Sequence, residues 1–460
     1  MIGGLVLALV AFAIYLATRV DRFYDHFVWQ AAAFLEGTAA IRYPVADTPA
    51  RLGNWFFQDV LPIVSSDGIA RGLIPFPPLP AVVLVPFVAA FGLTVDDQAI
   101  FTTLAAVDVA LCWWMLDRLE VRPVVRYATT MFFAFGTAFW YTAQVATTWY
   151  QAHIVAVGLL LIAVGRALGG AMNASGADAD RRSMGTPAPD DGRRRGRAVD
   201  ARALLIGVLV GLATTARLPV VFGLPFFVLV GPGEPGRRAR SVLIGAGIPI
   251  AVLLGWNIVS SGQPFHPAYD HLYQLEARAY PGLGYHAEWA AEDPRYLVQN
   301  LGIMFLTGPD VLPDHLRDTL GTMDRRLCSD PAATRGVFDV RCPIALPRDI
   351  GMSVLLASPA FLLIAATPSG GRRRRVVIGA ALAVLLISVV NLMHFSQGWV
   401  QFGYRFSNDV LPFALVLVAV GFDRLLDGAR RWAMPLSVGL IVASIVVNFW
   451  GVAWSRILGW

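Results

Sequence analysis

Two acids and a histidine stand close together near the start of the chain. The stretch DRFYDHFVWQAAAFLEG, residues 21–37, follows a first apolar run and contains Asp21, Asp25 and His26. If residues 21–37 form a helix, Asp21 and Asp25 lie one turn apart on a single face. Two carboxylates at that spacing repel, so the pair is tolerable where one acid is protonated, shares a cation or meets a hydroxyl group. Such a carboxylate can act as a general base towards a hydroxyl.

Each of these residues also has a purely structural interpretation. Asp25 can cap the helix that follows, because an acid at a helix N-terminus meets unpaired amides and the macrodipole. For His26, a solvated position at the membrane interface is favoured over a metal ligand. The four histidines of residues 260–348 lack a compact ligand spacing, so no zinc site is predicted there. No cofactor is predicted with certainty, and a divalent metal stays open.

The composition indicates a polytopic membrane protein. Hydrophobic residues make up 56% of the chain and charged residues 15%, and the apolar residues recur in runs of about 20, the length that spans a bilayer. All 37 basic residues are arginine, which excludes a Walker lysine and a Schiff-base lysine. The net charge of +5 does not indicate nucleic acid, because the arginines cluster between the apolar runs, as the positive-inside rule expects.

Four basic loops mark the predicted cytoplasmic side: residues 169–201, 231–240, 372–375 and 423–431. The first is also a low-complexity linker that we expect to be disordered. The chain then reads as a single all-α transmembrane domain, residues 1–460, with about eleven spans. The predicted spans are residues 2–18, 97–116, 124–141, 150–168, 202–217, 218–230, 241–259, 349–367, 376–394, 409–423 and 434–453.

Two long segments lie outside in this topology, the first outer loop 19–96 and the loop 260–348. The second is the better candidate for acceptor recognition. Its two cysteines, Cys328 and Cys342, either close a disulfide in an oxidising compartment or remain free thiols. Within the first, residues 77–92 form a short, proline-containing apolar run that either crosses the bilayer or lies flat in its outer interface.

Three segments resemble the GT-C superfamily of membrane glycosyltransferases, of the protein O-mannosyltransferase and aminoarabinose transferase type. They are DHFVWQAAAFLEG with PFPPLPAVVLVPF, then TTARLPVVFGLPF at 214–226, and GYRFSNDVLPFALVL at 403–417. The resemblance implies that the first outer loop carries the catalytic acid and that residues 77–92 lie along the outer surface with interfacial helices. It also implies that Arg217 and Arg405 hold the phosphate of a lipid-linked donor.

The polar residues around Arg405 support its predicted role as a phosphate ligand independently of the resemblance. A guanidinium can bind phosphate through two parallel hydrogen bonds, although an arginine at a span end often only reaches for the headgroups. No Gly-rich nucleotide loop follows a strand, and no cytoplasmic segment is large enough for a nucleotide-sugar domain. The activated sugar must therefore reach the outer face on a lipid.

We therefore expect a multi-pass cell-membrane glycosyltransferase with its active site on the extracytoplasmic face. It would pass one sugar, with inversion, from a polyprenyl-phosphate donor to an acceptor hydroxyl of a cell-envelope glycan, lipid or protein. A transporter or lipid flippase is the alternative, although Asp108 is the one charge near mid-span that would serve it. The candidate residues are Asp25 as the base with Asp21 assisting, Arg405 and Arg217 for the donor phosphate, and His26, Tyr404, Gln401 and Asp409 for the substrate.

Overall fold

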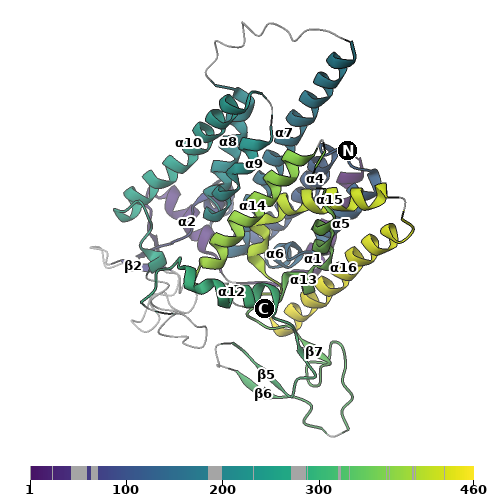
Figure 1. Cartoon of the computed structure of the whole chain (residues 1–460). Helices are drawn as coiled ribbons and strands as arrows, with labels where there is room; N and C mark the ends of the chain where they lie inside the picture. The colour runs from purple at the N-terminus through teal and green to yellow at the C-terminus, as the bar shows by residue number, and fades with distance from the viewer. Residues whose placement is uncertain are drawn as a thin grey trace.

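The computed structural model shows a mostly helical chain with a few short strands (Figure 1). It describes the backbone of all residues except 1, 23, 43–59, 64–70, 185–198, 232, 271–285, 287, 320–322, 331, 369, 372, 396–397, 399 and 429, and leaves out the side chains of 171–184. Much of the predicted linker 169–201 and part of the loop 260–348 therefore lie outside the described residues.

Among the described residues five helices are long and apolar enough to cross a membrane, which is compatible with a multi-pass membrane protein. They are α4 (Asp97–Asp117), the first part of α7 (Thr148–Met184), α10 (Pro235–Ser261), α14 (Arg374–Met393) and α16 (Ala433–Leu458). The expectation of about eleven spans goes further than this. Shorter helices occupy most of the remaining predicted spans: α1 (Ile2–Thr18), α8 (Ala201–Thr214), η4 (Leu218–Gly223) with α9 (Leu224–Leu229), and α15 (Leu411–Asp427).

Two predicted spans are broken into pieces. Residues 124–141 divide at Gly136 into α5 (Pro123–Phe135) and α6 (Phe139–Val145). Residues 349–367 divide at Ser358 into α13 (Val354–Ala357) and the 3-10 helix η7 (Pro359–Ala366). The second break has a local cause, since Pro359 disfavours a helical conformation in the residue before it.

Residues 77–92 form the helix α3 (Leu79–Phe91), which is continued by η2 (Gly92–Thr94). Thirteen helical residues extend about 20 Å, less than the hydrocarbon core of about 30 Å. Its buried side chains, Ala81 and Leu84 among them, belong to the same core cluster as Phe27 and Val28 of α2 (His26–Leu35). The length favours the interfacial position over a crossing.

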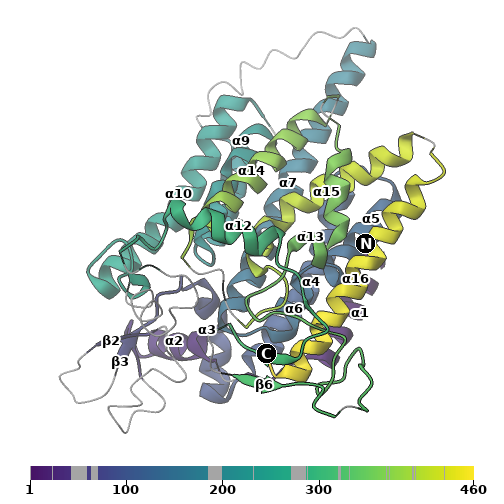
Figure 2. The same ribbon diagram turned by 60° about the horizontal axis from the view of Figure 1, so that its bottom comes forward.

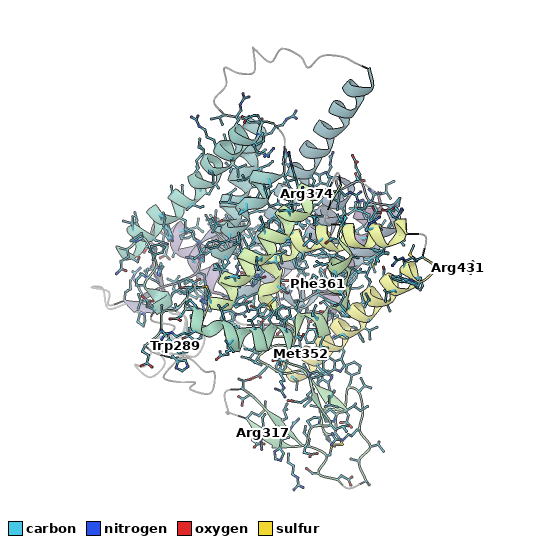
Figure 3. The ribbon with its side chains drawn as sticks, viewed as in Figure 1. Trp289, Arg317, Met352, Phe361, Arg374 and Arg431 are labelled. Atoms are coloured by element: carbon cyan, nitrogen blue, oxygen red, sulfur yellow. A yellow bond between two sulfur atoms is a disulfide. The ribbon has the colours of Figure 1, made fainter. Side chains whose placement is uncertain are left out.

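The charged side chains gather at two opposite ends of the bundle. At one end Arg122 bonds the Asp423 carbonyl at 2.8 Å and pairs with Asp427 at 2.5 Å, while Arg373 pairs with Asp423 at 2.9 Å. This brings together segments that were predicted to be cytoplasmic. At the other end Arg19 pairs with Asp96 at 2.7 Å. Figure 3 shows Arg374 and Arg431 well separated from Arg317 and Trp289.

The bundle core is centred on α15, whose side chains are buried from Leu411 to Asp423. Close helix contacts around it depend on small residues. A Cβ at Gly207 of α8 would lie 2.2 Å from the Val242 carbonyl oxygen of α10, and one at Gly245 would lie 2.2 Å from the Leu204 carbonyl oxygen. These distances are too short for any side chain, so glycine allows the two backbones to touch, as is common between membrane helices.

A small disulfide-containing lobe, residues 310–346, stands at the end of the bundle where the C-terminus lies (Figure 2). Cys328 and Cys342 are joined, which confirms the disulfide alternative. Leu316, Leu327 and Leu346 pack on Trp454 of α16. The strands are β4 (Asp310–Val311) paired with β7 (Ala345–Leu346) and β5 (His315–Arg317) paired with β6 (Asp324–Arg326), and elsewhere β1 (Ile41–Arg42), β3 (Arg71–Leu73) and β2 (Leu61–Ile63) form a sheet in that order.

The disulfide gives a first prediction. A Cys328→Ser, Cys342→Ser variant should lose about 3 kcal/mol of stability in this lobe, because the cross-link no longer restricts the unfolded loop. Limited proteolysis should then cut residues 310–346 many times faster than in the parent protein, with the helical bundle still protected. Equal cleavage rates in the two proteins would contradict this role.

Three short elements complete the described fold. The 3-10 turn η6 (Pro294–Tyr296) leads into α12 (Leu297–Phe305), and the 3-10 helix η8 (Arg405–Val410) leads into α15. Three large apolar side chains of α12, Val298, Leu301 and Phe305, are exposed, whereas Asn300 bonds the Leu392 carbonyl of α14 at 2.8 Å. This pattern is typical of a helix that lies on the bundle in the interface.

Candidate active site

Asp21 and Asp25 do not share a helix face, contrary to the expectation for residues 21–37. The helix begins at His26, and the described residues before it are not helical. The Asp21 side chain is 91% exposed and pairs with Arg19 at 3.1 Å. Arg19 also pairs with Asp96, so Asp21 belongs to an exposed ion-pair cluster.

Asp25 occupies the N-cap position of α2 without capping it. Its side chain accepts no capping hydrogen bond, and within the described part of the chain the carboxylate has no ion-pair partner. The residue is half-buried, and burial raises the pKa of the carboxyl to about 6. The backbone just before it is held firmly, because the Tyr24 carbonyl accepts hydrogen bonds from Thr147 at 2.7 Å and from Thr148 at 2.5 Å. Among the described residues the Asp25 carboxylate therefore has no capping hydrogen bond and no ion pair, and hydrogen bonds hold the backbone just before it in place.

His26 is fully buried, so the expectation of a solvated histidine at the interface is wrong. Its Nδ1 lies 3.1 Å from the Thr148 hydroxyl, and its ring packs among those of Tyr24, Phe76 and Trp149. Burial lowers the pKa of the imidazole to about 3, so His26 is neutral at pH 7. It packs beneath Asp25 and supports the loop.

Arg405 is a half-buried cation of the candidate site. It makes no salt bridge with any residue that the structure describes, and its Nε is buried with no hydrogen-bond partner there. The guanidinium lies 5.5 Å from the Tyr150 ring centre and 5.3 Å from that of Phe406. A Cβ at Gly398 would come within 2.6 Å of its central carbon. Two aromatic rings and a glycine backbone thus hold an arginine that lacks an anion.

A cavity of about 90 Å³ joins Arg405 to the loop that carries Asp25. Arg22 and Tyr24 come to it from that loop, and Tyr150 comes from α7. Asp25 itself follows directly after Tyr24. The remaining lining residues are Tyr141, Val145, Thr147, Trp149, Val400 and Trp460.

Arg217 is already paired within the protein, unlike Arg405. Its Nε and one terminal nitrogen donate to the two carboxylate oxygens of Asp409 at 3.1 and 2.8 Å. Asp409 also lies 2.9 Å from His153 Nδ1 and accepts from Asn391 at 3.1 Å. The buried Asp409 carboxylate therefore bonds to Arg217, His153 and Asn391 and makes no ion pair with Arg405 in the described part of the chain.

Gln401 and Tyr404 are buried beside Arg405. The Gln401 amide donates to the Ile350 carbonyl at 3.0 Å, and its oxygen accepts from the Arg405 backbone amide at 3.4 Å. Gln401 thus fixes the backbone from which Arg405 extends. Gln401 follows the lining residue Val400 in sequence, and Tyr404 precedes the lining residue Arg405. Neither Gln401 nor Tyr404 lines the cavity itself.

Asp97 is a candidate that the sequence reasoning missed. It is buried at the start of α4 and accepts a hydrogen bond of 2.5 Å from Gln151. Its carboxylate lies within range of electrostatic repulsion from Asp25. The signal was available in VDDQ, residues 95–98, where an acid begins a membrane-spanning helix. Asp97 is therefore the acid whose charge is affected by that of Asp25.

Among the described residues no group of three or more His, Cys, Asp or Glu side chains is placed to hold a metal ion. Asp25 and Asp97 supply two carboxylates on the same side of the bundle. The Gln151 amide nitrogen donates to Asp97, its Oε1 has no hydrogen-bond partner among the described residues, and the Tyr24 carbonyl already accepts from Thr147 and Thr148.

Comparison with known proteins gives no assignment: no family model, no curated protein and no solved structure matches the chain.

The pair of Arg217 with Asp409 leads to a prediction about stability. Arg217→Ala should lower the free energy of unfolding by about 3–5 kcal/mol, because it leaves the Asp409 carboxylate buried without its cation. Arg295→Ala is the matched control, since the Arg295 side chain is 57% exposed in its pair with Asp293, and its loss should lower the free energy of unfolding far less than the loss of Arg217. Thermal unfolding in detergent measures both. Equal shifts for the two variants would contradict a structural role for Arg217.

Proposed function

We propose that the protein is an integral membrane glycosyltransferase that passes a sugar from a polyprenyl-phosphate donor to an extracytoplasmic acceptor hydroxyl. The observation that carries the proposal is the cavity in which the uncompensated Arg405 meets the Asp25 loop. A half-buried acid with a pKa of about 6 suits a general base near neutral pH. An arginine without an anion suits a phosphate leaving group.

The proposed reaction is one displacement. The acceptor hydroxyl gives its proton to an Asp25 oxygen while its own oxygen bonds to the anomeric carbon. The bond from that carbon to the phosphate oxygen breaks, and polyprenyl phosphate leaves with the electron pair. Arg405 stabilises the negative charge that develops on the phosphate. Attack opposite to the leaving group inverts the anomeric centre, and no covalent intermediate with the protein is needed.

The other candidate residues act through these two. Arg217 and Asp409 hold η8 and thereby the start of the Arg405 side chain, while Gln401 holds the same backbone from the loop before it. The charges of Asp97 and Asp25 interact, so Asp97 can hold the acceptor hydroxyl or change the pKa of the base. Asp21 is too exposed to assist, so we propose no catalytic role for it.

The disulfide supports the extracytoplasmic face. Disulfides persist in oxidising compartments, and the lobe of Cys328 and Cys342 packs on Trp454 near the end of α16. The C-terminal residue Trp460, just beyond that helix, lines the cavity of Arg405. The cavity and the disulfide are thus on the same side of the bundle, where the activated sugar would have to arrive on a lipid.

The raised pKa of Asp25 predicts the pH dependence of transfer. Only the ionised carboxylate can accept a proton, so kcat/KM should rise with pH through about 6 and fall about tenfold per pH unit well below it. The folded state favours the protonated form of Asp25. Its contribution to the free energy of unfolding therefore increases as the pH falls from about 6 towards 4. Transfer assays and thermal unfolding between pH 4.5 and 8 measure the two effects. An activity profile without an inflection between pH 5 and 7 would contradict Asp25 as the base.

One observation favours transport as the second candidate. Asp108 is buried within α4, and its Oδ2 has no hydrogen-bond partner in the part of the chain that is described. An acid within a span often lies on an ion or proton pathway. The products distinguish the two functions, because a flippase moves a lipid-linked sugar without breaking its bond to phosphate.

A further inference from the structure

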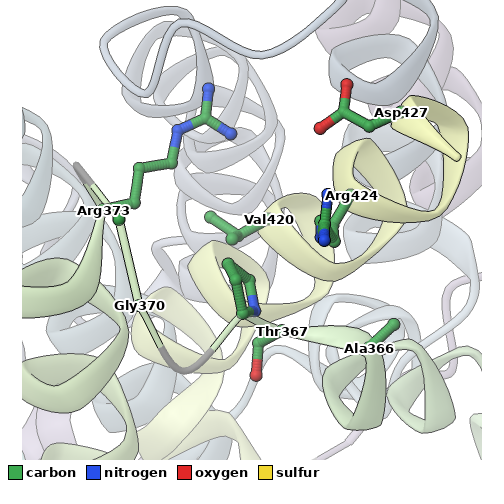
Figure 4. Close-up of a pocket in the computed structure, with 9 residues that line it drawn as sticks. Ala366, Thr367, Gly370, Arg373, Val420, Arg424 and Asp427 are labelled. Carbon is green, nitrogen blue, oxygen red and sulfur yellow. The ribbon is translucent and has the colours of Figure 1, made fainter.

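A second and larger cavity lies at the opposite end of the bundle from Arg405. It has a volume of about 680 Å³, within the range of about 300–1,000 Å³ that is typical of ligand sites. The cavity is an open hollow between α15 and the described residues that lead from η7 to α14 (Figure 4). These are the segments of the basic loops 372–375 and 423–431, which the positive-inside rule assigns to the cytoplasmic side.

The charges around this cavity leave one cation uncompensated. Figure 4 shows Arg373 and Asp427 on opposite sides, with Arg424 and Val420 between them. Arg373 pairs with Asp423 at 2.9 Å, and Asp427 pairs with Arg122 at 2.5 Å. Arg424 has no salt bridge with any described residue. The lining therefore carries one net positive charge, which suits a ligand with one negative charge.

The remaining lining residues narrow the ligand class. None of the nine residues that line the cavity is aromatic, so nothing there stacks on a base as nucleotide sites commonly do. Val420 and Ala366 give it an apolar side. Leu362, four residues before Ala366 on η7, is 51% exposed and gives the same helix an apolar surface along which an acyl chain can lie.

We propose that this cavity binds a phosphate group on the cytoplasmic side, with Arg424 as its principal contact. The apolar flank favours the headgroup of an anionic phospholipid over a free phosphate ion as the source. Basic pockets between helices at the cytoplasmic side of membrane proteins bind such headgroups. The Asp427 carboxylate does not oppose this, because Arg122 compensates its charge. The proposal does not depend on the glycosyltransferase activity, which uses the other end of the bundle.

Native mass spectrometry of the purified protein with added phosphatidylglycerol tests the proposal. We expect Arg424→Gln to weaken the tightest bound phosphatidylglycerol at least fivefold and Arg424→Lys to change it less than twofold. Arg430→Gln is the matched control, because Arg430 is exposed at the same end and does not line the cavity. Equal affinities in Arg424→Gln and Arg430→Gln would overturn the site.

A second arm separates the two sources of phosphate. The same variants are titrated with inorganic phosphate in lipid-free detergent. Binding of phosphatidylglycerol that depends on Arg424 and resists millimolar phosphate supports the headgroup. Arg424-dependent binding of inorganic phosphate alone upholds the phosphate site and overturns the lipid as its source. Sugar transfer does not enter either readout, so failure here leaves the proposed function to its own tests.

Discussion

Replacing Asp25 with asparagine is expected to lower kcat/KM for sugar transfer by about 10²–10⁴-fold, the usual contribution of a positioned general base. The amide has nearly the same shape, so the loop backbone held by Thr147 and Thr148 should not move. The asparagine amide, however, cannot accept the proton of the acceptor hydroxyl. The measurement is the initial rate of release of polyprenyl phosphate from the donor, with purified protein in lipid.

Asp21→Asn is the matched control for this variant. It removes the same charge four residues earlier in the chain, from a side chain that is 91% exposed, and should change the rate less than twofold. Thermal unfolding separates catalysis from folding. Because burial disfavours the ionised form of Asp25, the Asp25→Asn protein should unfold at the same temperature as the parent or higher. A full rate in Asp25→Asn would remove this residue as the base.

The Arg405→Gln variant should lose about 10²–10³-fold in kcat/KM, comparable to the loss of one preorganised donor that stabilises transition-state charge. The glutamine keeps a polar group in the cavity and removes both the charge and the paired donors. Arg405→Lys keeps the charge without the planar fork, so its rate should lie between the two. Donor titrations with each variant report whether kcat or KM changes.

Arg456 provides the control for Arg405. It lies near the cavity side of α16, where it donates to the Ala17 carbonyl at 3.2 Å and has no predicted contact with donor. Arg456→Gln should transfer sugar within twofold of the parent rate. If Arg405→Gln and Arg456→Gln behave alike, general loss of surface charge explains any effect and the phosphate role of Arg405 fails.

The helical part of the fold follows from apolar run lengths, whereas the start of α2 does not. The local signal for a helix start after Asp25 is its type, since an acid is favoured at the N-cap, but this does not exclude a helix that begins earlier. The backbone before α2 is held by Gln98, which comes from a distant segment. The Gln98 side chain donates to the Val20 carbonyl at 2.9 Å and accepts from the Arg22 amide at 3.2 Å. These long-range bonds hold the segment outside the helix and separate Asp21 from Asp25.

The candidate site shows the same limit of sequence reasoning. The resemblance and its polar neighbours both indicate Arg405, and the described structure leaves it without an ion pair, as a phosphate ligand would require. Arg217 looked equivalent in sequence, yet its partner Asp409 lies 192 residues away. One sequence without relatives contains no signal for such a pair. His26 looked solvated for a similar reason, because the rings of Phe76 and Trp149 that cover it come from other segments.

The most direct test of the account is the fate of the lipid donor with the purified protein in lipid vesicles. The protein is given a panel of polyprenyl-phosphate sugars together with a cell-envelope extract as acceptor. We predict that at least one donor is converted to free polyprenyl phosphate with its sugar joined, inverted, to an acceptor hydroxyl, and that both Asp25→Asn and Arg405→Gln abolish most of this conversion. Donor lipids that cross the vesicle membrane with the sugar still attached would contradict the account and identify a transporter.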